Sequence, residues 1–210
     1  MDARVSQDRV ETEDDLRGKY GKVSPLAAKK SLPRIDPHIR RFIGLSPFCC
    51  IATSRPDGGA DNSPRGDAPG FVTILDDRTL LIPDRPGNNR LDTMSNIIAS
   101  PNVGLIFFIP GVEETVRVNG RASITEDPDL LADMAVNGKT PKTAIRIDVE
   151  EAFLHCSKAL RRAKLWHADY KIDRKALPTL GQMITDQVET GMTAEEAETR
   201  VQDSIKKTMY

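Results

Sequence analysis

Residues 103–124, VGLIFFIPGVEETVRVNGRASI, decide the fold class of this chain. They contain two runs rich in Val, Ile, Thr and Phe, the residue types that favour β-strands, with turn residues between the runs. Polar and apolar residues alternate in the second run, which is the pattern of a strand with one polar and one apolar face. The polar face would carry Thr115, Arg117, Asn119 and Arg121, and the apolar face Val116, Val118 and Gly120.

Similar runs lie on both sides of this stretch. They are FCCIATS (48–54), GFVTIL (70–75), TLLIP (79–83) and AIRIDVEEAFLHC (144–156). Six strands with few helices between them predict a mostly antiparallel sheet that curls into a barrel. The predicted fold class is therefore mainly β, an antiparallel barrel with added helices.

Helices are predicted around and after these strands. At residues 36–46, Asp36 is a good N-cap and Pro37 fits the first helical position. A second helix is expected at 91–98 and a smaller one at 127–134, and the second would present one apolar face formed by Leu91, Met94, Ile97 and Ile98. The C-terminal quarter is expected to be helical, and its last helix opens with a capping box of Thr193 and Glu196.

These patterns divide the chain into three parts. Residues 1–35 form an N-terminal arm, which is either loosely held or contains a short helix packed on a neighbour. Residues 36–170 form the barrel domain. Residues 171–210 form a helical extension that packs on the barrel or on a partner subunit.

Composition and charge exclude several classes of function. The 210-residue chain has a formal net charge of -1, so we expect no general affinity for nucleic acid. Its longest apolar run is too short to cross a bilayer, and its acidic, polar N-terminus is unlike a secretion signal, so we expect a cytoplasmic protein. The three cysteines show no metal-binding spacing and are expected to be reduced and mostly buried.

Arginines along the central segment are the first candidate site. In RPGNNRLD (85–92), Arg90 stands where a helix is expected to begin, and a cation there is unfavourable unless a negative charge lies against it. One interpretation is a solvated barrel face with loop arginines. The other is a phosphate pocket, in which Arg65 and Arg90 supply charge while Asn88 or Asn89 and helix N–H groups supply directed hydrogen bonds. The complete set is Arg65, Arg85, Arg90, Arg117 and Arg121.

The segment NSPRGDAPGFV (62–72) is the second candidate. Its prolines and glycines indicate that it is not regular strand throughout. It is either a barrel corner or bulge, or a backbone edge whose free N–H and C=O groups face a flat heterocycle.

Other common sites lack their motifs. The three histidines are scattered, and neither a hydrolase elbow nor a Rossmann or P-loop glycine motif is present. We therefore expect no metal site and nominate no catalytic acid or base. His155 and Cys156 are adjacent, and side chains of adjacent strand residues point to opposite faces. Trp166 is interpreted as core or interface packing, or as a cover for a bound aromatic ring.

Taken together, these residues resemble the pyridoxamine 5'-phosphate oxidase-like FMN-binding split barrels, within a bacterial flavoprotein subgroup. The resemblance covers about residues 34–188, through DPHIRRFIGLSPFCCIATSRPDGGADNSPRGDAPGFV, LLIPDRPGNNRLDTMSNIIASPNVGLIFFIPGVEETVRVNGRASI, CSKALRRAKLW and LPTLGQMITDQ. It implies a homodimer with flavin mononucleotide (FMN) in two clefts at the subunit interface. No single motif is decisive, but their ordered set is specific.

The resemblance also implies site residues. The flavin would be lined by Arg65, Gly66 and Asp67, with Ile82 and Pro83 beside it, and Arg85 belongs to the same set. Its phosphate would be held by Asn88, Asn89 and Arg90. Thr115 falls where relatives often place a glutamine near the ring, and Arg117 lies on the same strip. The second subunit would contribute Lys158, Arg162 and Trp166.

Two departures from the family pattern limit what the resemblance implies. Asn89 replaces a second basic residue, which is expected to weaken the grip on the phosphate. The chain ends in helices, where pyridoxamine phosphate oxidases have a tryptophan- and arginine-containing strand motif for the substrate phosphate, so that reaction is not expected here. The leading hypothesis is an FMN-dependent oxidoreductase with a small-molecule donor or acceptor. The alternatives are a non-catalytic flavin-binding or redox-sensing protein, and a structural dimer with an empty cleft.

Overall fold

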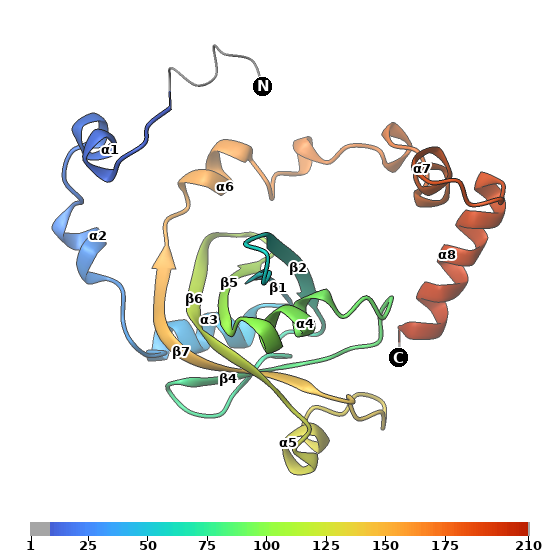
Figure 1. The fold of residues 1–210 in the computed structure, drawn as a ribbon, viewed down its shortest axis with the longest axis horizontal. Helices are drawn as coiled ribbons and strands as arrows, with labels where there is room; N and C mark the ends of the chain where they lie inside the picture. The colour runs from blue at the N-terminus through green and yellow to red at the C-terminus, as the bar shows by residue number, and fades with distance from the viewer. Residues whose placement is uncertain (1–8, 210) are drawn as a thin grey trace.

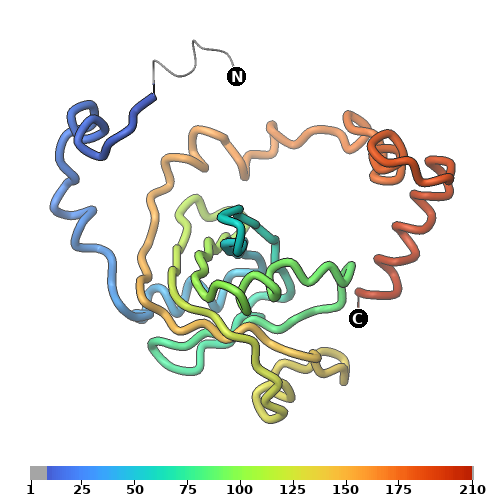
Figure 2. The backbone as a smooth tube through the Cα atoms, viewed as in Figure 1, coloured from blue at the N-terminus to red at the C-terminus, as the bar shows by residue number. Residues whose placement is uncertain are grey.

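The computed structural model describes residues 9–209, and one antiparallel sheet organises them (Figure 1). Its seven strands are hydrogen-bonded in the order β2-β1-β5-β6-β7-β4-β3. The backbone trace shows that the sheet curls (Figure 2). The buried apolar side chains form one large core cluster and a second, smaller one of Leu81, Leu131, Met134 and Ala144. The predicted split barrel with added helices is therefore confirmed. The strands are β1 (Phe48–Ser54), β2 (Ala60–Gly66), β3 (Thr73–Ile74), β4 (Thr79–Pro83), β5 (Asn102–Ile109), β6 (Val112–Thr125) and β7 (Ala144–His155).

The longest strand, β6, carries the alternation predicted from the sequence. Val116 and Val118 are fully buried, while Arg117 is exposed. Thr115 departs from the pattern, because it lies on the predicted polar face and is only 1% exposed. The pairing of β6 with β7 shifts register at Gly120, where a Cβ atom would lie 2.2 Å from the carbonyl oxygen of Asp148. Only glycine allows the two strands to approach this closely.

β2 is the strand that sequence analysis missed. It pairs with β1 from Phe48 opposite Gly66 to Ser54 opposite Ala60, and includes Pro64. It is an edge strand of the sheet, so the N–H group that proline lacks is not needed by a second neighbour. By contrast, the predicted strand at 70–75 is longer than the observed strand β3, which has only two residues.

Two helices fix the geometry near the barrel. α3 (Pro37–Leu45) begins at the predicted cap, where the Asp36 carboxylate accepts a hydrogen bond from the Ile39 N–H at 2.8 Å. α4 (Asp92–Ala99) turns only part of the predicted face inward, since Ile97 is buried and Met94 is half-buried. Its buried residues are Thr93, Asn96 and Ile97, while Leu91 and Ile98 are exposed.

The remaining helices lie around the barrel (Figure 1). Neither α1 (Glu13–Tyr20) nor α2 (Pro25–Lys29), both in the N-terminal arm, contains a buried residue. Residues 1–8 of the predicted arm lie outside the described residues. α5 (Pro128–Ala132) precedes β7, and the predicted C-terminal helices are α6 (Lys158–Ala163), α7 (Leu180–Gln187) and α8 (Ala194–Thr208), with two short 3-10 helices, Ala168–Tyr170 and Arg174–Ala176. The capping box at the start of α8 is confirmed.

The cysteines are less buried than predicted. Only Cys49 is buried; Cys50 is half-buried and Cys156 is exposed. Burial raises the pKa of the Cys49 thiol to about 12, so it is an unreactive core residue. Within residues 9–209, no helix combines the length and the apolar character that a bilayer crossing requires.

Candidate functional site

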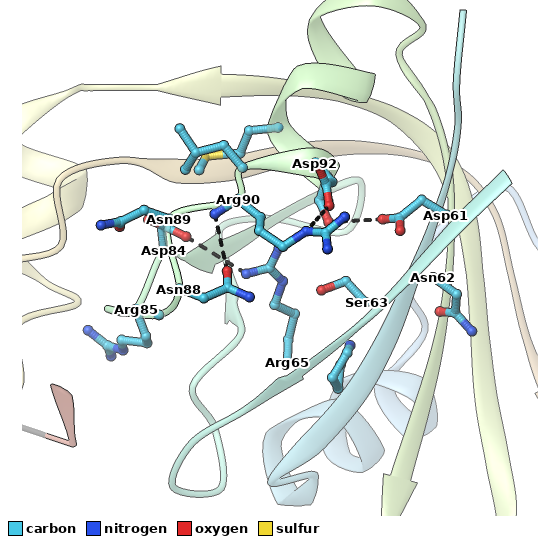
Figure 3. A pocket seen from close by; sticks show the side chains of 15 residues that line it. Asp61, Asn62, Ser63, Arg65, Asp84, Arg85, Asn88, Asn89, Arg90 and Asp92 are labelled. Carbon is cyan, nitrogen blue, oxygen red and sulfur yellow. Dashed lines mark hydrogen bonds and ion pairs between the residues drawn. The ribbon is translucent and has the colours of Figure 1, made fainter. Parts of the chain in front are cut away.

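A cavity of about 310 Å³ lies between the edge strand β2 and the loop that joins β4 to α4. Figure 3 shows Arg65, Asn88, Arg90, Asp61 and Asp92 gathered between these two segments. The cavity brings together five of the arginine and asparagine residues predicted from the sequence. The residues lining it are Asp61, Asn62, Ser63, Pro64, Arg65, Asp84, Arg85, Gly87, Asn88, Asn89, Arg90, Leu91, Asp92, Thr93 and Met94.

The loop presents the N-terminal end of α4 to this cavity. Asn89 and Leu91 have φ angles of 58° and 61°, the left-handed region that residues other than glycine seldom adopt. Leu91 is the N-cap residue, and no side chain caps the helix. The first hydrogen bond of the helix runs from the Ser95 N–H to the Leu91 carbonyl, so helix geometry leaves the amides of residues 92–94 without intrahelical partners. Such amides favour an anion.

Arg65 approaches the cavity from β2. It pairs with Cys49 across the β1–β2 ladder and therefore shares the core-facing side of the sheet. One of its terminal nitrogens lies 3.8 Å from the Asp84 carboxylate. Its Nε is buried and has no hydrogen-bond partner among the described residues. A buried donor of a cationic group without a partner is costly unless a ligand accepts from it.

Arg90 lies two residues before the first residue of α4, rather than in the first helical turn. Its Nε donates to the Asp92 carboxylate at 2.8 Å, and its backbone N–H donates to the side-chain oxygen of Asn88 at 3.1 Å (Figure 3). The negative charge expected beside this arginine is therefore supplied in part by Asp92. This ion pair is exposed, so the Arg90 side chain remains accessible to a ligand.

Three carboxylates that sequence analysis did not select also line the cavity: Asp61, Asp84 and Asp92. The cavity is lined by as many carboxylates as arginines, so their formal charges cancel. Directed hydrogen bonds must therefore contribute more to anion binding here than net charge. Burial raises the pKa of Asp84, and the positive charges of Arg65 and Lys142 oppose the rise. No motif in the sequence distinguishes these aspartates from ordinary surface carboxylates.

Four residues predicted near the flavin, Gly66, Asp67, Ile82 and Pro83, do not line this cavity. Ile82 lies in the apolar core, and Pro83 is buried at the end of β4. Gly66 ends β2, and Asp67 follows it. The Asp67 carboxylate accepts from Arg85 Nε at 2.8 Å, while another Arg85 nitrogen donates to the Met134 carbonyl at 2.9 Å. Arg85 thus connects the cavity loop to the segments that contain Asp67 and Met134.

The other predicted residues form a separate group on β6 and around α6. Arg65 is paired with Cys49, Cys49 with Phe107, and Phe107 with Val116, so Arg65 and Val116 lie on the same face of the sheet. Thr115 and Arg117 flank Val116 in β6 and therefore point to the opposite face. Lys158 and Arg162 are residues of α6. Trp166 Nε1 donates to the Val112 carbonyl at 2.9 Å, which holds the segment after α6 against β6.

His155 also belongs to this second group, although it was not among the predicted site residues. It pairs with Thr115 across the β6–β7 ladder, so the two side chains share a face. The Thr115 hydroxyl and His155 Nδ1 are both buried without a hydrogen-bond partner among residues 9–209. The Arg117 guanidinium lies 5.2 Å from the centre of the Phe153 ring beside them. Only the register of β6 against β7 places His155 beside Thr115, and that register cannot be read from the sequence.

Solved structures with similar folds include those of three other proteins. HupZ of Group A Streptococcus is 18% identical, with a TM-score of 0.47, and the match covers 57% of this chain and 93% of that one. General Stress Protein 26 of Bacillus anthracis is 18% identical, with a TM-score of 0.44 and coverage of 56% and 90%. An FAD binding protein of Mycobacterium smegmatis is 18% identical, with a TM-score of 0.41 and coverage of 59% and 98%.

A search of curated proteins finds no match to this chain. A family model gives a clear assignment. The model described as pyridoxamine 5'-phosphate oxidase matches residues 35–156, which is more than half of the chain and includes the strands, α4 and the whole cavity. The chain therefore belongs to the pyridoxamine 5'-phosphate oxidase family of split-barrel proteins.

Proposed function

We propose that this protein binds FMN in the cavity between β2 and α4 and acts as an FMN-dependent oxidoreductase. One observation carries the proposal: Arg65, whose Nε is buried without a hydrogen-bond partner among the described residues, and the uncapped end of α4 line the same cavity. A guanidinium fork and a helix N-terminus are both groups that recognise phosphate. Membership of a family whose members hold FMN supports the same ligand.

In this proposal, each group around the cavity has a defined role. Arg65 and Arg90 bind the phosphate, Asn88 and the amides at the start of α4 orient it, and Arg85 positions the loop. When bound, FMN supplies the redox chemistry, taking a hydride or electrons from a donor and passing them to oxygen or a small acceptor. The chain's own residues bind and orient it. The three aspartates in the lining predict modest rather than very tight affinity for the phosphate.

We further propose a homodimer with one FMN at each of two interface clefts. The group formed by Thr115, Arg117, Lys158, Arg162 and Trp166 does not line this chain's own cavity. It would serve the cleft of the partner subunit. Oxidation of pyridoxamine phosphate is not part of the proposal, because the chain between β7 and residue 209 forms helices in place of the substrate-binding strand motif.

The phosphate site is tested by titrating FMN against the wild-type protein and Arg90→Ala, with quenching of flavin fluorescence as the readout. Arg90 is 73% exposed at its side chain, so its loss should weaken binding by about tenfold, the lower end for a charge-assisted hydrogen bond. Arg146→Ala is the matched control, because this arginine pairs with Asp148 away from the cavity. Equal affinity of Arg90→Ala and wild type would count against the site.

Turnover separates the oxidoreductase from a non-catalytic flavin-binding or redox-sensing protein. The purified protein is supplied with FMN, a nicotinamide donor and an electron acceptor, and its steady-state rate is compared with that of the same concentration of free FMN. A rate well above free FMN is expected. A rate equal to free FMN across a panel of donors would favour the binding protein.

A further inference from the structure

A second cavity, of about 400 Å³, lies on the other side of the loop that lines the first. It is built from three segments that are distant in sequence: the loop at 84–89, the turn at 139–142 and the C-terminal end of α8. The two cavities share Asp84, Arg85, Gly87 and Asn89. Figure 3 shows the side chains of Arg85 and Asn89 directed away from the Arg90–Asp92 pair. The loop at 84–89 therefore lies between the two cavities and lines both of them.

The second cavity is strongly basic. Lys139, Lys142 and Lys207 all line it, and none of them forms an ion pair with a carboxylate of residues 9–209. Its acidic residue, Asp84, already lies near Arg65 of the first cavity. Lys142 lies close enough to Asp84 for its charge to oppose the rise in that carboxyl's pKa. Three ammonium groups around one cavity repel one another, and a bound polyanion would relieve that repulsion.

The rest of the lining suits a nucleotide. Pro86 and Pro141 provide apolar surface, and Thr140 and Thr208 provide hydroxyl groups. A mixed lining of apolar walls and a few polar groups is typical of small-molecule sites, and 400 Å³ lies within their usual range of about 300–1,000 Å³. Lysine binds phosphate as a point charge, without requiring the fixed geometry of an arginine fork.

We propose that this second cavity binds a nucleoside diphosphate group. Two dinucleotides carry this chemistry: a flavin adenine dinucleotide whose flavin end occupies the first cavity, and a nicotinamide dinucleotide that acts as electron donor. Both place phosphates beside the loop at 84–89. The proposal extends the flavin site described above, but the second cavity can be tested without flavin.

ADP is the direct probe, because it contains the nucleoside diphosphate and no flavin. We expect isothermal titration of the full-length protein to detect ADP binding, and the double variant Lys142→Gln/Lys207→Gln to weaken it by about tenfold or more. Lys175→Gln is the matched control, because Lys175 is an exposed residue that lines neither cavity. Absence of ADP binding, or an equal affinity of the double variant and wild type, would overturn the proposal.

Two further measurements identify the source of the diphosphate. If it belongs to the cofactor, the double variant loses affinity for flavin adenine dinucleotide and keeps its affinity for FMN. If it belongs to the donor, the KM for a nicotinamide dinucleotide rises while affinity for both flavins is unchanged. A double variant that leaves the affinity for both flavins and the KM for the nicotinamide dinucleotide unchanged would overturn the proposal. Wild-type protein that binds ADP but not FMN would count against the proposed flavin site alone.

Discussion

Arg65→Met is expected to cause a large loss of FMN affinity. Methionine keeps much of the side-chain length and removes the cation, including the buried Nε that has no partner among the described residues. One charge-assisted hydrogen bond contributes about 1.5–3 kcal/mol. The Arg65 side chain is only 22% exposed, so we take the upper part of that range, about 2–3 kcal/mol. The dissociation constant should therefore rise by about 30- to 150-fold in a fluorescence titration at fixed ionic strength.

Two controls separate this effect from misfolding. Thermal unfolding of Arg65→Met should remain cooperative, because Asp84 can take up a proton once its cation is removed. Arg65→Lys keeps the charge and loses the fork, so its affinity should lie between those of wild type and Arg65→Met. A folded Arg65→Met variant that binds FMN as tightly as wild type would refute the assignment of Arg65 to the phosphate.

Three further predictions test the surroundings. Asp92→Asn should tighten FMN binding by up to about fivefold, because it frees Arg90 from an exposed ion pair; weaker binding in the titration would contradict this. Gly120→Ala should lower the free energy of unfolding in urea by about 2–3 kcal/mol, since its Cβ would collide with the Asp148 carbonyl; an unchanged value would show that the strands can separate freely. Burial and two nearby cations lower the pKa of His155, so the unfolded chain takes up a proton more readily as pH falls below about 6.5. Wild type should therefore lose more thermal stability between neutral and mildly acidic pH than His155→Gln, and parallel curves would refute that.

Local sequence rules predicted the elements whose causes are local. The cap at Asp36, the capping box at Thr193 and the alternation in β6 each depend on residues a few positions apart. All are confirmed, with the exception of Thr115 in β6. The segment at 62–72 is not strand throughout, as predicted, because β2 ends at Gly66 and β3 begins at Thr73. β2 itself was not predicted, although an edge strand tolerates Pro64. Whether a strand is at an edge depends on the whole sheet, which no short window of sequence contains.

The inward face of α4 was predicted only in part, for a related reason. Of the predicted apolar face, Ile97 is buried and Met94 is half-buried, while Leu91 and Ile98 are exposed and Thr93 and Asn96 are buried instead. Asn96 can be buried because its side-chain amide donates a hydrogen bond to the Thr53 hydroxyl at 2.9 Å. Such a partner lies on another strand and is not visible in the periodicity of the helix.

The candidate site was predictable in part. Arg65, Asn88 and Arg90 were selected by residue type and by the expected helix start, and the structure brings them into one cavity. The aspartates that balance them were not, because a carboxylate in a loop carries no local signature. The second cavity could not be predicted at all, since Lys142 and Lys207 line one cavity only because of where α8 lies in the fold.

The central claim is that the cavity between β2 and α4 holds FMN, and the visible absorbance spectrum of the protein purified without added cofactor tests it most directly. Mass spectrometry of the material released on heating identifies the bound molecule. The account predicts a flavin spectrum and FMN released at about one molecule per chain, as expected for a dedicated site. A colourless protein that also fails to bind added FMN would contradict it.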